Sequence, residues 1–135
     1  MASWLLKTEP SEYSWEDLER DRRTVWDGVT INAALKNMRA VKEGDEAVVY
    51  HTGDERAAVG VARIASAPYP DPRARDSRLV VFDVTPERRL PRPVPLAAIK
   101  ADRAFAASDL VRIPRLSVVP LPDALWRRLL ALAGL

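Results

Sequence analysis

The sequence predicts an α+β fold: a curved sheet or small β-barrel, mostly antiparallel, with helices flanking it. Three strand-like segments, at 46–51, 57–64 and 78–85, follow one another through short connections, and such neighbours pair antiparallel. Segments with helical periodicity precede and follow them, which is typical of the mixed α+β class. The chain has 135 residues and shows no internal repeat, linker or low-complexity segment, so residues 1–135 are expected to form one domain.

The N-terminal part predicts a strand followed by a short helix. Residues 4–7, WLLK, form a short apolar strand. Residues 14–17, SWED, resemble a capping box with Asp in the place usually taken by Glu or Gln, so a helix should begin here and run to about Asp21. Trp15 and Leu18 are three positions apart and are expected to share its buried face.

A second helix is expected from Asn32, whose side chain can cap it, to about Val41. Ile31, Leu35 and Met38 recur at positions i, i+4 and i+7, which predicts that these three side chains face the core.

The middle of the chain predicts the main sheet. Strand 46–51 is apolar, and strand 57–64 contains Gly60, where a bend or a close backbone approach is expected. Residues 67–72 carry three prolines and cannot form a regular central strand, because proline supplies no N–H. Residues 78–85 alternate between two faces, as a strand does.

The C-terminal part predicts short elements that close the domain. Residues 90–95 are proline-rich and extended, and a short helix is expected at 96–101 with another helical turn near Ala104. A last strand at 117–121 and a helix at 123–133 complete the chain.

Several functional classes find no support in the sequence. The absence of cysteine excludes disulfides and cysteine-based metal sites and fits a reducing cytoplasm, where we expect the protein to reside. No apolar run is long enough to span a membrane, and the N-terminus does not resemble a secretory signal. With one histidine, no phosphate-cradling glycine loop and no Gly-x-Ser-x-Gly elbow, we expect neither a metal nor a cofactor.

Charge is distributed unevenly along the chain. Residues 1–60 carry 8 basic and 12 acidic residues, whereas residues 61–135 carry 13 and 7, so the second half is basic. Arginine supplies 17 of the 21 basic residues, and its planar fork suits phosphates and base edges. A GC-rich genome would also enrich arginine, so the charge permits a polyanionic partner without requiring one.

The segment 24–32, TVWDGVTIN, places Trp26 in a loop beside an Asp–Gly turn, which is an exposed setting for a large flat ring. Other polar and aromatic side chains also stand at predicted strand ends and loops. Together they are Lys7, Trp26, Asp27, Asn32, Tyr50, His51, Thr52 and Arg115. Each also has an ordinary structural interpretation, such as a core tryptophan, a strand-end histidine, a tyrosine that packs on the sheet or an arginine paired with a surface carboxylate.

Several motifs in this order resemble the EVE domain family, which includes the thymocyte nuclear protein type. They are SWLLKTEP, YSWEDL, VWDGV, NMRAVKEGDEAVVYHTG, VGVARI, PYPDP, RLPRPVPLAAIKAD and LVRIPRLSVVPL. The resemblance runs from about Trp4 to Trp126. It implies a PUA-like fold and a nucleic-acid-binding module that reads a modified, for example methylated, base in DNA or RNA. The family's pocket lies between the barrel and the helices after its first strand.

By motif, the resemblance assigns residues of this chain to the pocket and its rim. They are Trp26, Asp27, Gly28 and Val29 from WDGV, Tyr50, His51 and Thr52 from YHT, Lys7 and Glu9 from LLKTEP, and Arg115, Leu116 and Ser117 from the RLSV segment. One stretch departs from the family pattern: many members continue WDGV with Arg-Asn-Tyr-Gln-Ala-Arg, whereas residues 30–35 here read TINAAL. A chain without those arginines, tyrosine and glutamine is expected to read its ligand differently or more weakly.

Recognition of a base taken out of its stack needs a flat apolar surface and a hydrogen-bonding edge. Trp26 can supply the surface, because stacking on one aromatic contributes ~1–3 kcal/mol. Asp27 or the amides near Gly28 can meet the polar edge, and Asn32, His51 and Thr52 can read substituents. Phosphates are expected on the basic half of the chain and at the rim, specifically on Lys7, Arg88, Arg89, Arg92, Arg112, Arg115 and Ser117.

Two other functions remain open from the sequence. ASCH-type relatives of this fold resemble small amidohydrolases that act on modified nucleosides through Lys, Thr and a carboxylate, and Lys7, Thr8 and Glu9 offer those groups. Neighbours on a strand face opposite ways, however, so Thr8 should point away from the other two. The domain could instead serve mainly to contact another protein. We expect a monomer or weak dimer that binds nucleic acid and neither a membrane nor a metal.

Overall fold

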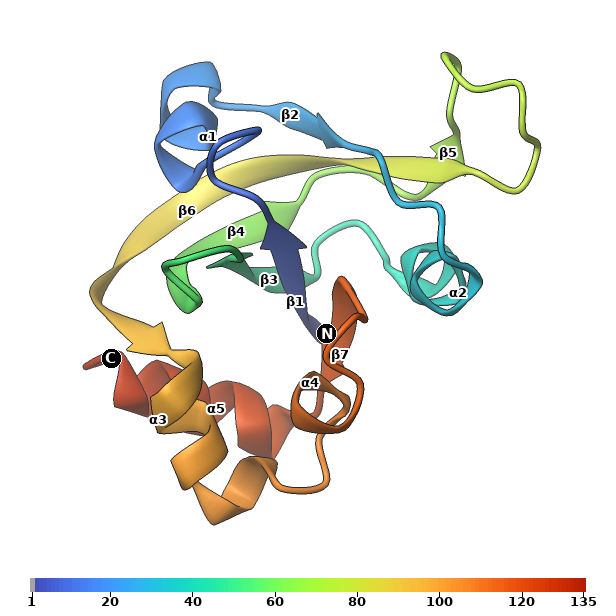
Figure 1. Ribbon diagram of the computed structural model, residues 1–135. Helices are drawn as coiled ribbons and strands as arrows, with labels where there is room; N and C mark the ends of the chain where they lie inside the picture. Colours follow the sequence, from blue (N-terminus) through green and yellow to red (C-terminus); the bar gives the residue numbers. More distant parts are fainter. Residues whose placement is uncertain (1) are drawn as a thin grey trace.

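The computed structural model describes residues 2–135, in which a curled mixed sheet forms a half-barrel flanked by helices (Figure 1). Seven strands make up the sheet: β1 Ser3–Thr8, β2 Thr24–Trp26, β3 Glu46–His51, β4 Ala57–Ile64, β5 Tyr69–Pro70, β6 Val80–Pro95 and β7 Val118–Leu121. The helices are α1 Trp15–Asp21, α2 Asn32–Ala40, α3 Leu96–Ala101, α4 Asp109–Arg112 and α5 Asp123–Leu132, with a 3₁₀ turn, η1, at Arg103–Phe105.

The strands follow the order β2-β6-β4-β3-β1-β7, and β5 pairs with β6 outside this path. β1 runs parallel to β3, and every other pairing among the described strands is antiparallel. The predicted antiparallel pairing of the three central strands, β3, β4 and β6, is therefore confirmed. The curl leaves β2 and β7 as the two edges of the sheet, so the half-barrel has an open seam between them.

Helix α2 lies beside β7, next to this seam (Figure 1). The Asn37 side chain at its middle donates a hydrogen bond from Nδ2 to the Val118 carbonyl, 2.7 Å away, and so satisfies a free backbone group of the edge strand. At the start of β7, the Lys7 N–H donates to the Ser117 carbonyl at 2.9 Å. These bonds fix the β1–β7 side of the seam.

Helix α1 begins with the predicted capping box. Ser14 Oγ accepts from the Asp17 N–H at 3.1 Å, and the Asp17 carboxylate accepts from the Ser14 N–H at 2.9 Å. Trp15 and Leu18 are buried, as expected. The Trp15 ring packs directly on Gly60, where an added Cβ would lie 2.5 Å from it, so the close approach predicted at Gly60 is confirmed.

The start of α2 differs from the prediction. Ile31, and not Asn32, occupies the N-cap position, and Ile31 is 57% exposed instead of facing the core. Asn32 is the first helical residue, and its Oδ1 accepts from Arg78 Nη1 at 2.6 Å. Ala34 is buried with Leu35 and Met38, so the core-facing side of the helix includes Ala34 and excludes the N-cap residue Ile31.

Strand β6 is longer than expected. The predicted strand at 78–85 and the extended segment 90–95 belong to one strand, Val80–Pro95, whose pairing with β4 shifts register at two places. Such irregularities accommodate prolines in a strand, since bulged positions need no ladder N–H. The two-residue strand β5 and helix α4 were not predicted.

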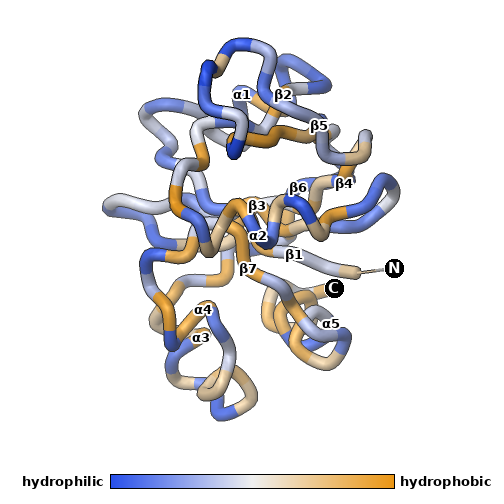
Figure 2. Tube along the Cα trace, turned by 90° about the vertical axis from the view of Figure 1, so that its right-hand side faces the viewer, coloured by the Kyte–Doolittle hydropathy of each residue, from blue (hydrophilic) through white to orange (hydrophobic). Residues whose placement is uncertain are grey.

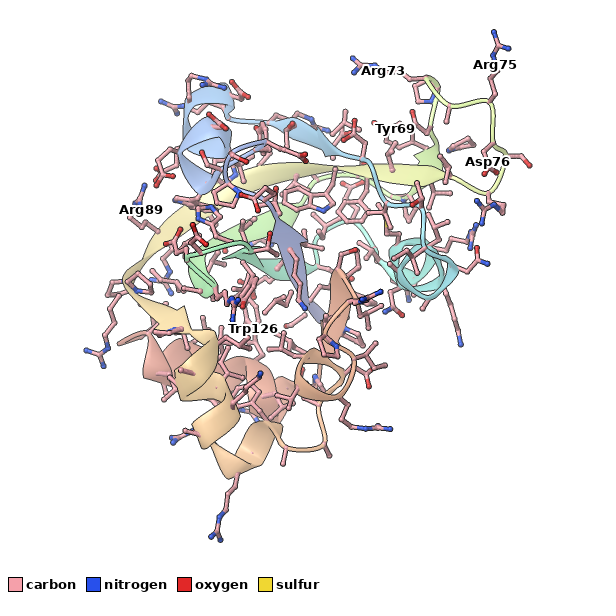
Figure 3. All side chains as sticks on the ribbon, viewed as in Figure 1. Tyr69, Arg73, Arg75, Asp76, Arg89 and Trp126 are labelled. Atoms are coloured by element: carbon pink, nitrogen blue, oxygen red, sulfur yellow. The ribbon has the colours of Figure 1, made fainter. Side chains whose placement is uncertain are left out.

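Buried apolar side chains lie on both faces of the sheet. Residues Trp4, Leu5 and Leu6 of β1 are all buried despite their alternating directions, because the half-barrel interior covers one face and the C-terminal helices cover the other. Apolar segments in Figure 2 follow the central strands and α5 accordingly. Trp126 of α5 lies between this helix and the sheet (Figure 3).

Candidate nucleic-acid interface

A hollow of about 460 Å³ opens at the seam, between β2 on one side and the ends of β1 and β7 on the other. The loop between β1 and α1 forms a further wall. The lining residues are Lys7, Thr8, Glu9, Glu12, Tyr13, Thr24, Val25, Trp26, Asp27, Gly28, Val29 and Ser117. We call this space the seam hollow.

Trp26 reaches the seam hollow from an edge strand and not from the loop that was predicted. It is the last residue of β2 and pairs with Phe82 of β6, which buries most of its ring and leaves 7% exposed. The backbone turns directly after it at Gly28, whose φ of +78° is readily adopted only by glycine. An added Cβ at Gly28 would meet no atom within 4 Å, so this turn borders open space.

Polar groups line the seam hollow beside the ring. Asp27 is exposed, and no hydrogen bond within residues 2–135 occupies its carboxylate. Thr8 Oγ1 donates to the Tyr13 carbonyl at 2.7 Å, and Glu9 Oε2 accepts from Thr52 Oγ1 at 3.3 Å. The Asp27 carboxylate, next to Trp26 in the chain, is thus free to accept from a ligand, as is the exposed Glu12 carboxylate in the same hollow.

Lys7 stands between the seam hollow and a second one. Its Nζ donates to the Pro114 carbonyl at 2.9 Å and lies 5.8 Å from the centre of the Tyr50 ring. Burial lowers the pKa of the Lys7 ammonium from its usual value. Tyr50 and Thr52 line the second hollow, which has a volume of about 290 Å³. Lys7 lines both hollows, whereas Tyr50 and Thr52 do not line the seam hollow.

His51 lies outside both hollows and is 2% exposed. Its Nε2 accepts from the Trp15 N–H at 2.9 Å, and its Nδ1 lies 2.7 Å from Glu55 Oε1. Nε2 must be unprotonated to accept, so Nδ1 carries the proton and donates to Glu55. These contacts hold the first turn of α1 against β3. Asn32, at the exposed start of α2, also lines neither hollow.

The arginines expected to hold phosphates are spread over the surface. Arg112 and Arg115 are exposed near α4, and neither lines a hollow described here. Arg88 and Arg89 project from β6, and Arg89 pairs with Glu16 and Glu19 of α1 at 2.8 and 2.7 Å (Figure 3). The charge of Arg89 is therefore largely balanced within the protein.

Four lining residues were not among the predicted site residues: Glu12, Tyr13, Thr24 and Val25. Tyr13 precedes the capping box, and its hydroxyl donates to Asp21 Oδ2 at 3.0 Å; burial raises the pKa of this phenol. Thr24 begins β2. Thr24 and Val25 belong to the segment predicted as a loop, and Glu12 and Tyr13 precede the capping box, so only the fold reveals that all four line the hollow.

Within residues 2–135, no group of three His, Cys, Asp or Glu side chains is arranged to hold a metal ion. None of the helices in that range is both long and apolar enough to cross a membrane.

The chain is similar to proteins that share its whole fold. It is 30% identical to thymocyte nuclear protein 1 of Gallus gallus over 87% of this chain, although it spans only 63% of that relative. A solved protein of Rhodopseudomonas palustris superposes with a TM-score of 0.93 at 34% identity, over 99% of this chain and 94% of that one.

Human THYN1, solved in complex with DNA that contains 5-methylcytosine, superposes with a TM-score of 0.91 at 28% identity, over 100% of this chain and 99% of that one. An ASCH protein of Zymomonas mobilis superposes with a TM-score of 0.63 at 11% identity, which shows a shared fold alone.

The family model that describes the EVE domain matches residues 2–132. Together with the half-barrel, this match establishes that the chain belongs to the EVE domain family.

Proposed function

We propose that this protein binds nucleic acid and receives one modified base, of the 5-methylcytosine class, in the seam hollow. The observation that carries the proposal is the position of Trp26: a tryptophan on an edge strand that lines a hollow of about 460 Å³ left open by the curl of the sheet. That volume is within the range of about 300–1,000 Å³ found for small-molecule sites. The complex of human THYN1 with 5-methylcytosine DNA supports the same class of ligand.

The chemistry beside Trp26 suits a cytosine. A carboxylate is the natural acceptor for the exocyclic amine of cytosine, and the Asp27 carboxylate is exposed with no partner in residues 2–135. Stacking on the indole contributes ~1–3 kcal/mol, whereas burial of one methyl group contributes about 0.8 kcal/mol. Trp26 therefore contributes more to binding of the base than the methyl group does, and the methyl group supplies a preference of a few-fold.

DNA is the polymer we propose, and single- and double-stranded forms are compared in the test. Extrusion of a base from a duplex costs a few kcal/mol, and a single strand avoids this cost. A single-stranded methylated oligonucleotide should therefore bind at least as tightly as the duplex of the same length, and an RNA of the same sequence serves as the third arm.

The test is fluorescence anisotropy with labelled oligonucleotides that carry either cytosine or 5-methylcytosine. Trp26→Ala should weaken binding to the methylated strand roughly 5- to 150-fold, which corresponds to the loss of one stacking contact. Asp27→Ala, at an exposed position where folding is not at risk, should weaken binding about 5- to 30-fold and reduce discrimination between cytosine and other pyrimidines.

Trp126→Phe is the matched control, because Trp126 is buried outside both hollows. It should bind as the parent does. If Trp26→Ala and Asp27→Ala fold and bind both oligonucleotides as the parent does, the seam hollow is not the base site.

Catalysis is the second candidate, and one observation favours it. Lys7, Thr8 and Glu9 all line the seam hollow, although strand alternation predicted that Thr8 would face away. Against it, Lys7 Nζ and Thr8 Oγ1 both donate to backbone carbonyls. Incubation with acetylated cytidine, followed by chromatography, separates the two functions: deacetylated product that accumulates with time would establish an amidohydrolase, and none is expected.

A further inference from the structure

The second hollow differs from the seam hollow in its charge. Three cationic side chains line it, Lys7 from β1, Arg56 from the β3–β4 turn and Lys100 from α3. Its other lining residues include no carboxylate, and no ion pair within residues 2–135 involves any of the three cations. We call this space the basic hollow.

Two of the three cations are held in place by backbone carbonyls, which orient a cation without neutralising it. Lys7 Nζ donates to the Pro114 carbonyl at 2.9 Å, and Arg56 Nε donates to the Gly53 carbonyl at 3.2 Å. The acidic side chains on the β3–β4 turn, Asp54 and Glu55, do not line the basic hollow; they line an adjoining hollow, which Arg56 and Lys100 also border. Glu55 is engaged by His51 at 2.7 Å.

The backbone at Arg56 is strained, which sets this position apart from an ordinary surface arginine. Its φ of +48° lies in the left-handed region, which residues with a side chain seldom adopt. The Arg56 carbonyl accepts from the Leu96 N–H at 2.8 Å, so the turn is tied to the start of α3. This tie brings Arg56 to the same hollow as Lys100, four residues further along α3. Strain of this kind persists where the surrounding structure holds it, and it is often found at ligand sites.

We infer that the basic hollow binds a backbone phosphate of the nucleic-acid strand whose base enters the seam hollow. This inference rests on the proposed function. Lys7 lines both hollows, so a strand that places a base beside Trp26 passes Lys7 and meets Arg56 and Lys100 next. A phosphodiester is the group along such a strand that matches an open site lined by Lys and Arg and free of carboxylates.

This arrangement assigns Tyr50 and Thr52 to the phosphate contact. Both line the basic hollow, and the Tyr50 ring lies under the Lys7 ammonium at 5.8 Å. They therefore belong with the phosphate contact and not with base reading, and their replacement should weaken binding without altering the preference for a methylated base.

The test measures how the affinity of the full chain for a single-stranded 5-methylcytosine oligonucleotide depends on salt. The variants are Arg56→Gln, Lys100→Gln and the double variant; Lys100 is exposed, so its replacement leaves folding intact. Loss of one phosphate contact should lower the slope of log K against log [salt] by about 0.7 for a single strand. The ratio of affinities for methylated and unmodified strands should stay at the parent value, because phosphate contacts carry no base information.

Arg127→Gln is the matched control. Arg127 is exposed on α5, has no ion pair in residues 2–135 and lines neither hollow, so the slope should not change. A double variant that folds and keeps both the parent slope and the parent affinity refutes the phosphate site, even if the methyl preference depends on Trp26. A parent chain that binds no oligonucleotide refutes the proposed function itself, so the two failures are distinguishable.

Discussion

At the scale of single residues, side chains of one motif have separate tasks. The YHT motif comprises Tyr50, His51 and Thr52 at the end of β3. Tyr50 and Thr52 line the basic hollow, whereas both ring nitrogens of His51 are engaged within the protein. The sequence could mark the segment as important, but it could not separate these tasks, since the direction of each side chain depends on which elements cover the two faces of the strand.

We expect His51→Leu to lower the free energy of unfolding by about 1–3 kcal/mol, because the buried N–H of Trp15 loses its acceptor. Urea denaturation followed by circular dichroism measures the change. The preference for a methylated base should persist in the folded variant. An unchanged unfolding midpoint would show that the Trp15–His51 bond contributes nothing.

Gly60→Ala should destabilise the protein by about 1–3 kcal/mol, since the new methyl group would overlap the Trp15 ring, 2.5 Å from the ideal Cβ position. The same substitution in a Trp15→Leu background should cost less, because the smaller side chain leaves room. A double-mutant cycle of urea midpoints measures this coupling. Equal costs in the two backgrounds are incompatible with a direct contact.

At the scale of elements, prediction succeeded where local patterns decide the structure. The capping box located α1, the apolar runs located β3 and β4, and helix α3 lies at the predicted 96–101. Prediction failed for β2, because three residues contain too little periodicity to indicate a strand. β2 exists through its pairing with β6, about sixty residues further along the chain, and this pairing turns Trp26 from a loop residue into the wall of the seam hollow.

Asp83 of β6 joins three strands near this wall. Its carboxylate accepts from Tyr69 of β5 at 2.6 Å and from Arg23, directly before β2, at 2.8 Å. These two contacts hold the pKa of the Asp83 carboxyl below its usual value, and the hydrogen bond from Tyr69 has the larger effect. A carboxyl whose pKa is lower in the folded than in the unfolded protein stabilises the fold at pH values above its unfolded-state pKa, about 3.9 for Asp. This stabilisation is lost as the pH falls through the folded-state pKa.

We therefore expect Asp83→Asn to be less stable than the parent near neutral pH and to lose less stability than the parent on acidification below about pH 4. Thermal unfolding midpoints across a pH series measure both effects. Parallel pH profiles for the two proteins would show that Asp83 does not link protonation to folding. Asp54→Asn is a suitable control, because Asp54 is exposed and no hydrogen bond or ion pair within residues 2–135 involves its carboxylate.

At the scale of the whole molecule, the functional hypothesis depends on an incomplete barrel. The sequence predicted a curved sheet, but whether it closes depends on the curl of six strands in one path and on the edges β2 and β7, which lie some ninety residues apart in the chain. The open seam exposes part of Trp26 beside a turn and places Lys7 between two hollows. Of the predicted pocket, WDGV, Lys7 and Ser117 line the seam hollow, while Asn32 and His51 do not.

The four tryptophans allow a direct test of this arrangement, because among them Trp26 alone lines the seam hollow. Each indole gives its own Nε1–H signal in a ¹H–¹⁵N spectrum, and the signals can be assigned by single substitutions. On titration with a 5-methylcytosine oligonucleotide, we expect the Trp26 signal to move progressively while those of Trp4, Trp15 and Trp126 stay in place. Saturable binding that shifts another indole and leaves Trp26 unmoved would contradict a base site at the seam.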